Sequence, residues 1–327
     1  MALKILGTGG YLPPKVVTND DLAKTLDTSD EWIYSHTGIH ARHIAGEDDC
    51  TSTMATKAAR AAMEAAGAKP EEIGLIVVAT SSPDYNTFPS TACLVQAALG
   101  CPATGAYDLQ AACAGFVYAL DQARCWVKEN RTRKAIVIGA ETLSRVVDWR
   151  DRASCILFGD GAGAVVIGDV PEEEGPSAHS VLWADGNGAK FITREGGTRL
   201  APVPGTVQIP FLELQGHDVF AFAVRSLAKV TNQLCERLGT TPDCLDRVFA
   251  HQANGRIIEA VARRMKLPLE KFYLNLEKTG NTSAASIPLA LDEAVRKGEL
   301  TAGMKIVLCG FGAGLTYAGT YMQWPYL

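Results

Sequence analysis

The chain repeats itself at a nearly constant spacing, and this repeat restricts the possible folds more than any other feature. In each copy a helical pattern ends at a glycine that is followed by a proline, and a strand pattern comes next. A helix–strand unit that occurs twice predicts two similar α/β halves whose sheets are buried by helices. The matching positions are Gly67 and Gly239, 172 apart (239 − 67), Pro70 and Pro242, 172 apart (242 − 70), and Lys134 and Lys305, 171 apart (305 − 134).

We place the two halves at residues 1–173 and 174–327, since 327 residues are enough for two hydrophobic cores. Residues 171–210, rich in glycine and proline, are expected to connect the halves through irregular strands. Apolar runs predict strands at residues 4–7, 75–80, 135–139, 155–158, 164–167 and 247–250. Helices are expected at residues 20–26, 30–35, 52–66 with Thr51 or Ser52 as cap, and from 218 onward.

Two glycine clusters resemble nucleotide-binding loops, but the sequence that follows each cluster argues against this interpretation. Residues 7–10 are expected to break the first strand, and the prolines at 13 and 14 prevent a helix from following. Residues 161–163 lead into a strand instead of a helix, which is typical of close backbone packing. A nucleotide-dependent oxidoreductase therefore remains only as a rival hypothesis.

The stretch around Cys113 combines a thiol with the predicted start of a helix. Small residues flank the cysteine, and Phe116, Leu120 and Ala123 follow at three- and four-residue spacing. Unpaired N–H groups at a helix N-terminus stabilise a thiolate and lower the pKa of a cysteine. Cys113 is therefore a candidate nucleophile. The alternative is a small buried hydrophobic residue, the commoner role of a free cysteine.

The repeat brings two further polar residues to equivalent positions. Asn281 lies in the stretch 280–288, which corresponds to the helix start at Cys113, and His251 lies at a strand end that corresponds to residues 80–83. Ligand chemistry in α/β sheets gathers at the carboxyl ends of strands and the helix starts beyond them. We therefore expect Cys113, His251 and Asn281 to face one another across a pseudo-twofold axis. Singly, His251 could be a core histidine and Asn281 a turn residue.

A thiol with a histidine and an asparagine also fits a cysteine protease, although no protease-type sequence surrounds the cysteine. The motifs instead resemble the β-ketoacyl-acyl carrier protein synthase III family over essentially the whole chain. The resemblance implies an α/β, thiolase-like duplicated fold, with two similar halves whose mixed sheets sandwich buried helices. In chain order the motifs are Trp32, residues 37–39, 42–43, 88–90, 111–116, 158–163, 251–254, 280–284 and 310–314.

The resemblance also implies a reaction. Cys113 would take an acyl group from acyl-CoA, and the acyl-enzyme would then condense with malonyl-acyl carrier protein after loss of CO₂. His251 Nε2 and the Asn281 amide would donate to the thioester oxygen of the enolate, while the backbone N–H groups of Cys113 and Ala313 would form the oxyanion hole. Such an enzyme starts fatty-acid chains and needs no cofactor. The alternative is a related condensing enzyme of secondary, polyketide-like metabolism.

Binding residues carried over by resemblance are distributed over several segments. Three departures from the family pattern, at His36, Ala153 and Ala313, touch no catalytic side chain. The arginines fit an acidic carrier protein, or else a solvated helix face. The residues are Trp32 and Arg152 for adenine, Asn254, Phe220 and Ala223 for pantetheine, Arg256, Arg263 and Arg264 for the carrier protein, and Phe88 for the acyl pocket, across a homodimer interface.

Composition limits the partners and the compartment. A net charge of −5 argues against nucleic acid. Nine cysteines without CxxC spacing indicate neither disulfides nor zinc, and His36, His40, His43 and Cys50 lack a second ligand pair, so no metal is expected. No apolar run has membrane-spanning length and no leader pattern opens the sequence, so we expect a cytoplasmic protein without membrane contact. A non-catalytic thiolase-fold scaffold is the remaining rival.

Overall fold

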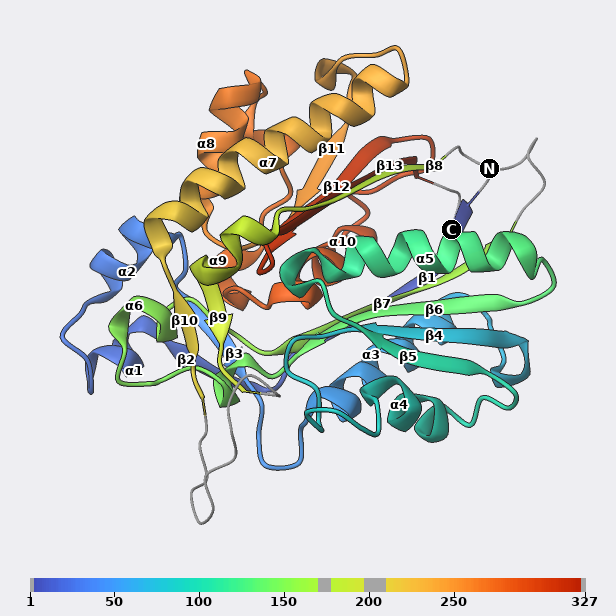
Figure 1. Cartoon of the computed structure of the whole chain (residues 1–327), viewed down its shortest axis with the longest axis horizontal. Coiled ribbons are helices and arrows are strands. Elements are labelled where there is room, and N and C mark those ends of the chain that lie inside the picture. Colours follow the sequence, from blue (N-terminus) through green and yellow to red (C-terminus); the bar gives the residue numbers. More distant parts are fainter. Residues whose placement is uncertain (1–2, 170–177, 197–209, 325–327) are drawn as a thin grey trace.

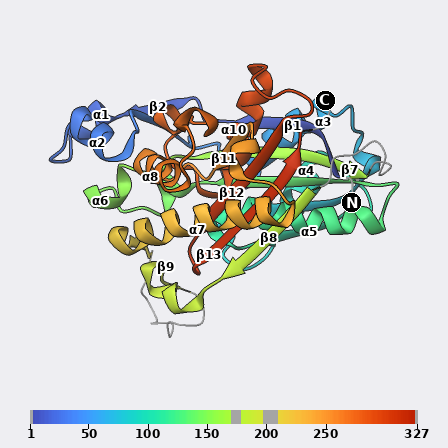
Figure 2. The same cartoon turned by 90° about the horizontal axis from the view of Figure 1, so that it is seen from above.

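Two mixed sheets lie on either side of a pair of buried helices, and further helices cover the outer face of each sheet (Figure 1). The computed structural model describes residues 3–169, 178–196 and 210–324. The buried helices are α5 (Gly115–Glu129) and α10 (Ser286–Arg296). One outer layer holds α3 (Thr51–Ala65) and α4 (Thr91–Leu99), and the other holds α7 (Gly216–Arg237) and α8 (Gly255–Met265). Figure 2, seen from above, shows α7 lying across the strands of the second sheet.

The two sheets share one topology. The first has the order β1-β7-β6-β4-β5 and the second the order β8-β13-β12-β11, and the corresponding pairs run in the same relative directions. A single parallel bridge from Val248 to Phe272 stands where β5 pairs with β4. The strands are β1 (Leu3–Tyr11), β4 (Ile73–Ala79), β5 (Gly105–Leu109), β6 (Lys134–Glu141), β7 (Gly161–Asp169), β8 (Ala178–Ala184), β11 (Arg247–Ala250), β12 (Lys305–Gly312) and β13 (Thr316–Gln323).

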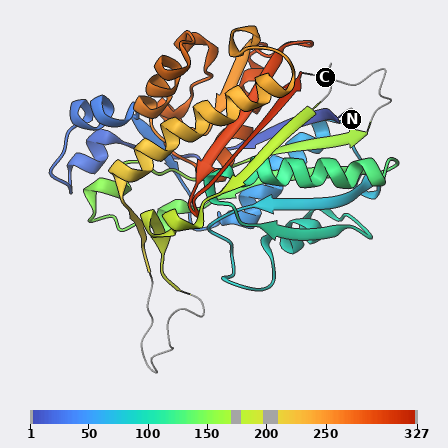
Figure 3. The same cartoon turned by 45° about the horizontal axis from the view of Figure 1, so that its top comes forward.

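The core between the sheets is built on the predicted apolar stripe of α5. Phe116, Leu120 and Ala123 are fully buried, and they join a single cluster with side chains of both sheets and of α10. Figure 3 shows α5 between strands of the two sheets. The expected duplicated fold, with sheets around buried helices, is therefore confirmed.

Smaller elements cluster at the edge where the two sheets meet. They carry several of the predicted binding residues. They are β2 (Lys15–Thr18), α1 (Asn19–Ala23), α2 (Asp30–Thr37), β3 (Ala41–Ile44), α6 (Arg152–Cys155), β9 (Ile192–Arg194), β10 (Leu212–Leu214) and α9 (Leu276–Thr279). The predicted connection at 171–210 lies partly outside the described residues, and its described part forms β8, a 3₁₀ turn (Gly186–Phe191) and β9.

The glycine cluster at residues 7–10 does not break the first strand, contrary to expectation. β1 continues to Tyr11 because α3 packs directly on its backbone. A Cβ atom at Gly7 would lie 2.5 Å from the carbonyl oxygen of Ala62, and one at Gly9 would collide with Ala58. These glycines therefore allow a helix to approach the strand closely.

Two other predictions of local structure are wrong. Residues 155–158 form no strand, because Asp151 accepts a hydrogen bond from Ala153 N and starts the short helix α6 there. The N-cap of α3 is Cys50, since Thr51 and Ser52 lie inside the helix, where their side chains bond to Ser82 and Asp84. The first error arises from a local helix cap, and the second arises because long-range contacts hold the side chains of Thr51 and Ser52.

Candidate active site

Two equivalent turns meet at the centre of the molecule. The 3₁₀ turn Ala112–Ala114 precedes α5, and the 3₁₀ turn Ser283–Ala285 precedes α10. Each opens with a residue in the left-handed region, Ala112 at φ 47° and Ser283 at φ 48°. The equivalence pairs Cys113 with Ala284, so the turns are 171 positions apart (284 − 113), one less than the 172 between the matching glycines. Gly139 of β6 lets the turn before α10 approach the strand closely, because a Cβ atom at this position would collide with the Ala284 carbonyl oxygen.

Cys113 lies in the first of these turns, half-buried, with its backbone against the end of β12. A Cβ atom at Gly312 would lie 2.6 Å from Cys113 N, and one at Gly310 would lie 3.1 Å from Cys113 O. Both strand positions must therefore be free of side chains for the cysteine to sit here. The second half of the chain thus supplies a wall of the site around the thiol.

The helix start does not lower the pKa of Cys113, contrary to expectation. Burial raises the pKa of this thiol to about 12, and the nearby charge of Glu141 adds to the increase. A hydrogen bond from the Ser283 side chain acts in the opposite direction but does not compensate. The resting thiol is therefore protonated, and its activation needs more than the helix terminus.

His251 follows β11 and is buried, with 1% of its surface exposed. Its Nδ1 lies 2.8 Å from Ser286 Oγ, and its ring meets Phe311 edge-on with centroids 5.4 Å apart. Burial lowers the pKa of His251 to about 3, so the ring is neutral at physiological pH. Ser286 Oγ also lies 2.8 Å from Ser283 O. For Nε2 to carry the proton and donate, the single Ser286 hydroxyl hydrogen must point to Nδ1 instead of to Ser283 O.

Asn281 is held by its backbone and by one side-chain oxygen. Its N–H donates to Leu157 O at 2.8 Å, and its C=O accepts from Gly159 N at 3.0 Å. The side-chain Oδ1 accepts from Ser283 N at 2.9 Å, which fixes the amide and leaves Nδ2 to donate. An oriented amide donor next to the thiol turn can stabilise developing negative charge on oxygen.

Ser283, which we did not predict, is the residue that connects the three candidates. Its turn contacts the Cys113 turn, its N–H donates to Asn281 Oδ1, and its C=O lies 2.8 Å from Ser286 Oγ, which also contacts His251. Its hydroxyl also donates to the buried Glu141 at 2.9 Å. The only sequence signal was its place in the stretch 280–288 that matches the Cys113 turn.

The turn after β12 carries Ala313, the second expected oxyanion donor. Thr316 Oγ1 bonds to Ala313 O at 3.1 Å and to Ala111 O at 2.9 Å, so one hydroxyl ties this turn to the segment before Cys113. The backbone of Ala313 therefore lies at the same wall of the site as Cys113.

Trp32 and Arg152, the residues predicted to bind adenine, meet at the edge of the molecule. The Arg152 guanidinium lies 4.7 Å from the centre of the Trp32 ring, and His36 stacks on the same indole at 4.3 Å. The ring is 36% exposed. Asn254 caps α8 and donates to His36 O at 3.1 Å, which joins this edge to the second half.

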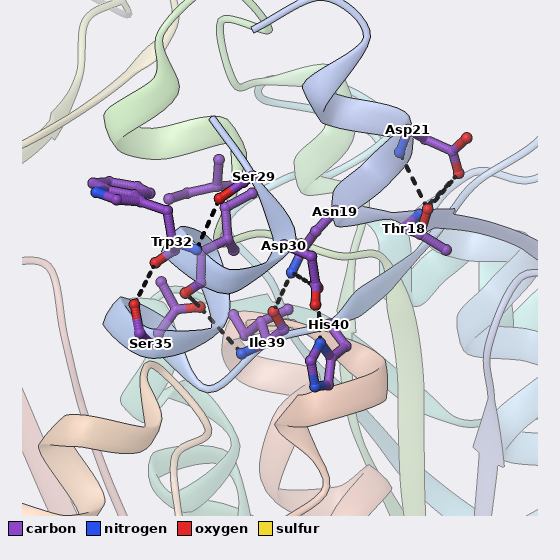
Figure 4. Close-up of polar contacts among 12 residues, drawn as sticks. Thr18, Asn19, Asp21, Ser29, Asp30, Trp32, Ser35, Ile39 and His40 are labelled. Atoms are coloured by element: carbon purple, nitrogen blue, oxygen red, sulfur yellow. Dashed lines mark hydrogen bonds and ion pairs between the residues drawn. The ribbon is translucent and has the colours of Figure 1, made fainter. Parts of the chain in front are cut away.

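A partly exposed polar network around the buried Asn19 positions α2, the helix that carries Trp32 (Figure 4). Asn19 Nδ2 donates to Asp30 Oδ1 at 2.8 Å and to Ile39 O at 2.6 Å, and His40 Nδ1 contacts the same carboxylate at 2.8 Å. These hydrogen bonds, His40 first, lower the pKa of Asp30. The Trp32 indole therefore projects from a helix that hydrogen bonds hold at its start, through Asp30, and just after its end, through Ile39.

The other binding candidates are not all in one place. On α7, Ala223 is fully buried while Phe220 is 38% exposed. On α8, Arg263 and Arg264 are exposed, whereas Arg256 donates from Nε to Ser35 O at 2.6 Å. Phe88 is 80% exposed, and Ala153 lies in the short helix α6.

A duplicated α/β fold that brings Cys113, His251 and Asn281 together defines a thiolase-fold condensing enzyme. Family models for 3-Oxoacyl-[acyl-carrier-protein (ACP)] synthase III match residues 107–186, and for its C-terminal part residues 235–324. The chain belongs to the 3-oxoacyl-[acyl-carrier-protein] synthase III family. The Beta-ketoacyl-[acyl-carrier-protein] synthase III of Caldanaerobacter subterraneus subsp. tengcongensis is 48% identical over 327 residues, 99% of this chain and 98% of that relative.

Solved structures agree with this assignment. The crystal structure of 3-oxoacyl-[acyl-carrier-protein] synthase III from Aquifex aeolicus VF5 is 43% identical with a TM-score of 0.91, covering 98% of this chain and 100% of that chain. The priming β-ketosynthase from the R1128 polyketide biosynthetic pathway is 36% identical with a TM-score of 0.92, covering 99% of this chain and 97% of that chain. The expected family and fold are confirmed.

Neither a metal-binding group nor a membrane-spanning helix occurs among the described residues. Between residues 3 and 324, outside the gaps at 170–177 and 197–209, no three His, Cys, Asp or Glu side chains form a metal-binding group. No described helix combines the length and the apolar character needed to cross a bilayer.

Proposed function

We propose that the chain condenses an acyl-CoA primer with malonyl-acyl carrier protein, releasing CO₂ and a 3-oxoacyl-acyl carrier protein, and so initiates fatty-acid synthesis. The observation that carries this function is the meeting of the two central turns, which sets the Cys113 thiol beside the segment that holds the Asn281 amide through Ser283 and the neutral His251 ring through Ser286. The relative that is 48% identical supports it. The reaction as written needs no cofactor.

In the first half-reaction Cys113 attacks the thioester and CoA leaves. The backbone N–H groups of Cys113 and Ala313 hold the oxyanion, since both lie at the wall formed by the end of β12. A backbone donor survives side-chain replacement, so the departure from the family pattern at Ala313 leaves this function intact.

In the second half-reaction malonyl-acyl carrier protein loses CO₂. The enolate that forms carries negative charge on the thioester oxygen, which His251 Nε2–H and Asn281 Nδ2–H stabilise. A neutral histidine suits this role, because it donates without adding charge to a buried site. The enolate carbon then attacks the acyl group on Cys113.

Trp32 and Arg152 bind the adenine end of CoA, and Asn254, Phe220 and Ala223 line the path of the pantetheine. Trp32→Ala is expected to raise KM for acyl-CoA about tenfold with little change in kcat, because stacking of a base on an aromatic ring is worth about 1–3 kcal/mol. Steady-state kinetics measure this. Trp149→Ala is the matched control, since Trp149 is 37% exposed and lies outside α2. An unchanged KM in Trp32→Ala would contradict the assignment.

The carrier protein docks on the exposed basic face of α8. Arg264 lines an open hollow of about 670 Å³ with Arg225 and Lys229 of α7. Arg263 is exposed on the same helix. Arg256 joins this face at the N-terminal end of the helix. Clustered positive charge steers an acidic partner to the surface even though the whole chain is negative.

The protein acts as a cytoplasmic homodimer. Within each chain the two thiolase-like halves span residues 1–173 and 174–327. The exposure of Phe88, at 80%, supports the dimer, because a large apolar side chain of this kind is commonly covered by a partner. There it bounds the acyl pocket of the neighbouring protomer.

A panel of primers tests the proposed function. We expect release of CO₂ and formation of a 3-oxoacyl product from acetyl-CoA or another short primer with malonyl-acyl carrier protein, followed by mass spectrometry of the carrier protein. Rejection of every short primer, with turnover of longer or aromatic ones, would favour secondary metabolism, the alternative to which the 36% identical polyketide relative points.

A further inference from the structure

Arg42 is a buried arginine to which the proposed reaction assigns no part. It lies on β3 with none of its surface exposed. Its stem is enclosed, because a Cβ atom at Gly159 or Gly280 would lie only 3.2 or 3.1 Å from Arg42 Cβ. Burial lowers the pKa of Arg42 to about 10, so the guanidinium is charged at neutral pH. A charge is costly to bury unless hydrogen bonds satisfy it, so the hydrogen-bond partners of Arg42 indicate its role.

The guanidinium joins three segments that are far apart in the sequence. Nη2 donates to Asn19 Oδ1 at 2.8 Å and to Ile156 O at 2.7 Å, and Nη1 donates to Val17 O at 3.2 Å. The planar fork of an arginine holds several acceptors in a fixed arrangement, whereas a lysine ammonium is a single point that imposes none. Arg42 therefore fixes β2 and the start of α1 relative to the end of α6.

The hydrogen bond to Asn19 connects Arg42 to the helix that carries Trp32. Asn19 Nδ2 donates at 2.8 Å to Asp30, the first residue of α2 (Figure 4). It also donates at 2.6 Å to the carbonyl oxygen of Ile39, two residues beyond the end of α2. Asn19 is fully buried, so water does not compete for these hydrogen bonds. One amide therefore ties both ends of α2 to the guanidinium.

The hydrogen bond to Ile156 connects Arg42 to the helix that carries Arg152. α6 consists of four residues, and a helix this short is not stable without tertiary contacts. Asp151 caps its start by accepting from Ala153 N, and Ile156, its C-cap, is held through its carbonyl oxygen by Arg42. The free carbonyl groups at a helix end need donors, and a cation is favoured there. The position of the Arg152 backbone therefore depends on Arg42.

We propose that Arg42 is a positioning residue for acyl-CoA, which sets the separation of Trp32 and Arg152. These two side chains, 4.7 Å apart from ring centre to guanidinium, are assigned to adenine in the proposed function, and the inference rests on that assignment. Since Arg42 is fully buried, it acts through α2 and α6 and not by touching the ligand. A gap of about 0.5–1 Å already removes about a quarter to a half of the dispersion attraction between two groups. A small shift of either helix therefore weakens the binding of CoA.

The Kd of CoA, measured by titration calorimetry on the full chain, tests the proposal without any turnover. Arg42→Lys keeps the charge but loses the planar fork, so the three acceptors are no longer held together. We expect the Kd to rise about threefold to tenfold and to stay at or below the Kd of Trp32→Ala, because stacking on the adenine is weakened and not removed.

Acylation of Cys113 by two donors separates positioning from a general structural defect. Acetyl-pantetheine carries the same thioester as acetyl-CoA but lacks the adenine. In Arg42→Lys, kcat/KM for acylation should fall about threefold to tenfold with acetyl-CoA and should keep the wild-type value with acetyl-pantetheine, followed by intact mass. Equal losses with the two donors would mean a distorted fold and would overturn the proposal.

Arg133→Lys is the matched control. Arg133 is a partly buried arginine that donates to the carbonyl oxygen of Ile73, at the start of β4, and its replacement should leave the Kd of CoA unchanged. Asn19→Ala is the second variant if Arg42→Lys does not fold, since it leaves the guanidinium in place and cuts its link to α2. The same rise in Kd is expected.

Trp32→Ala separates failure of this proposal from failure of the proposed function. A raised Kd in Trp32→Ala, together with a wild-type Kd in Arg42→Lys and Asn19→Ala, would overturn the proposal and leave the adenine assignment standing. A wild-type Kd in Trp32→Ala would remove the adenine assignment itself, and the proposal with it.

Discussion

Cys113→Ala is expected to abolish the acyl-enzyme and to lower condensation by at least about 10⁴-fold, the scale seen when a nucleophile is removed. The reason is that Cys113 is the thiol at the junction of the two central turns and at the wall that holds the oxyanion. Intact-mass measurement after incubation with acetyl-CoA should show one added acetyl group in the wild type and none in the variant.

Cys93→Ala provides the control for this experiment. Cys93 is an exposed free thiol on α4, so its loss should leave both the adduct and the turnover unchanged. An acetyl adduct that persists in Cys113→Ala would place the acyl group on another side chain and would remove the basis of the proposed function. A thiolase-fold scaffold without catalysis predicts no adduct in either protein.

His251→Ala and Asn281→Ala are expected to separate the two half-reactions. Each removes one donor to the enolate, which costs about 2.7–4 kcal/mol and therefore about 10²–10³-fold in condensation. The acetyl adduct on Cys113 should still form, since neither side chain is used in that step. Rapid-quench mass spectrometry measures acylation, and CO₂ release measures decarboxylation.

His179→Ala is a suitable control, because His179 lies on β8 outside the central turns. Loss of acylation in His251→Ala, with the fold intact by circular dichroism, would mean that His251 acts as a base toward the thiol. The pH profile gives a second reading. Since burial lowers the pKa of His251 to about 3, the ring gains a proton only below that range, and kcat should show no step from this residue between pH 5 and 9.

The duplication made most of the architecture predictable. Helix ends at glycine and proline, and strands framed by lysine and glycine, depend on local sequence, so the repeat could be read without the structure. The same reasoning predicted that His251 and Asn281 lie near Cys113; in the structure Asn281 contacts Ser283 and His251 contacts Ser286, at the turn that meets the Cys113 turn. Because the two halves pack against each other symmetrically, residues at equivalent positions of the repeat can lie close together in space.

The predictions that failed depend on contacts between distant segments. The pKa of Cys113 is set by burial between the halves and by Glu141, neither of which a helix-start pattern contains. An isolated acidic residue such as Glu141 is usually exposed, so nothing in its local sequence indicates burial. The serines that satisfy it come from the segment after β4 and from the turn before α10, and this convergence has no local signature.

The glycines at the central turns set a limit on how the enzyme can change. Gly139, Gly310 and Gly312 each bring one backbone against another, and any side chain there would push the two halves apart. Random mutation at these positions should yield unfolded protein, not altered selectivity. Libraries that aim at new primers should therefore spare these glycines and vary Phe88, which is 80% exposed and bounds the acyl pocket in the proposed dimer, so that substitution leaves the core unchanged.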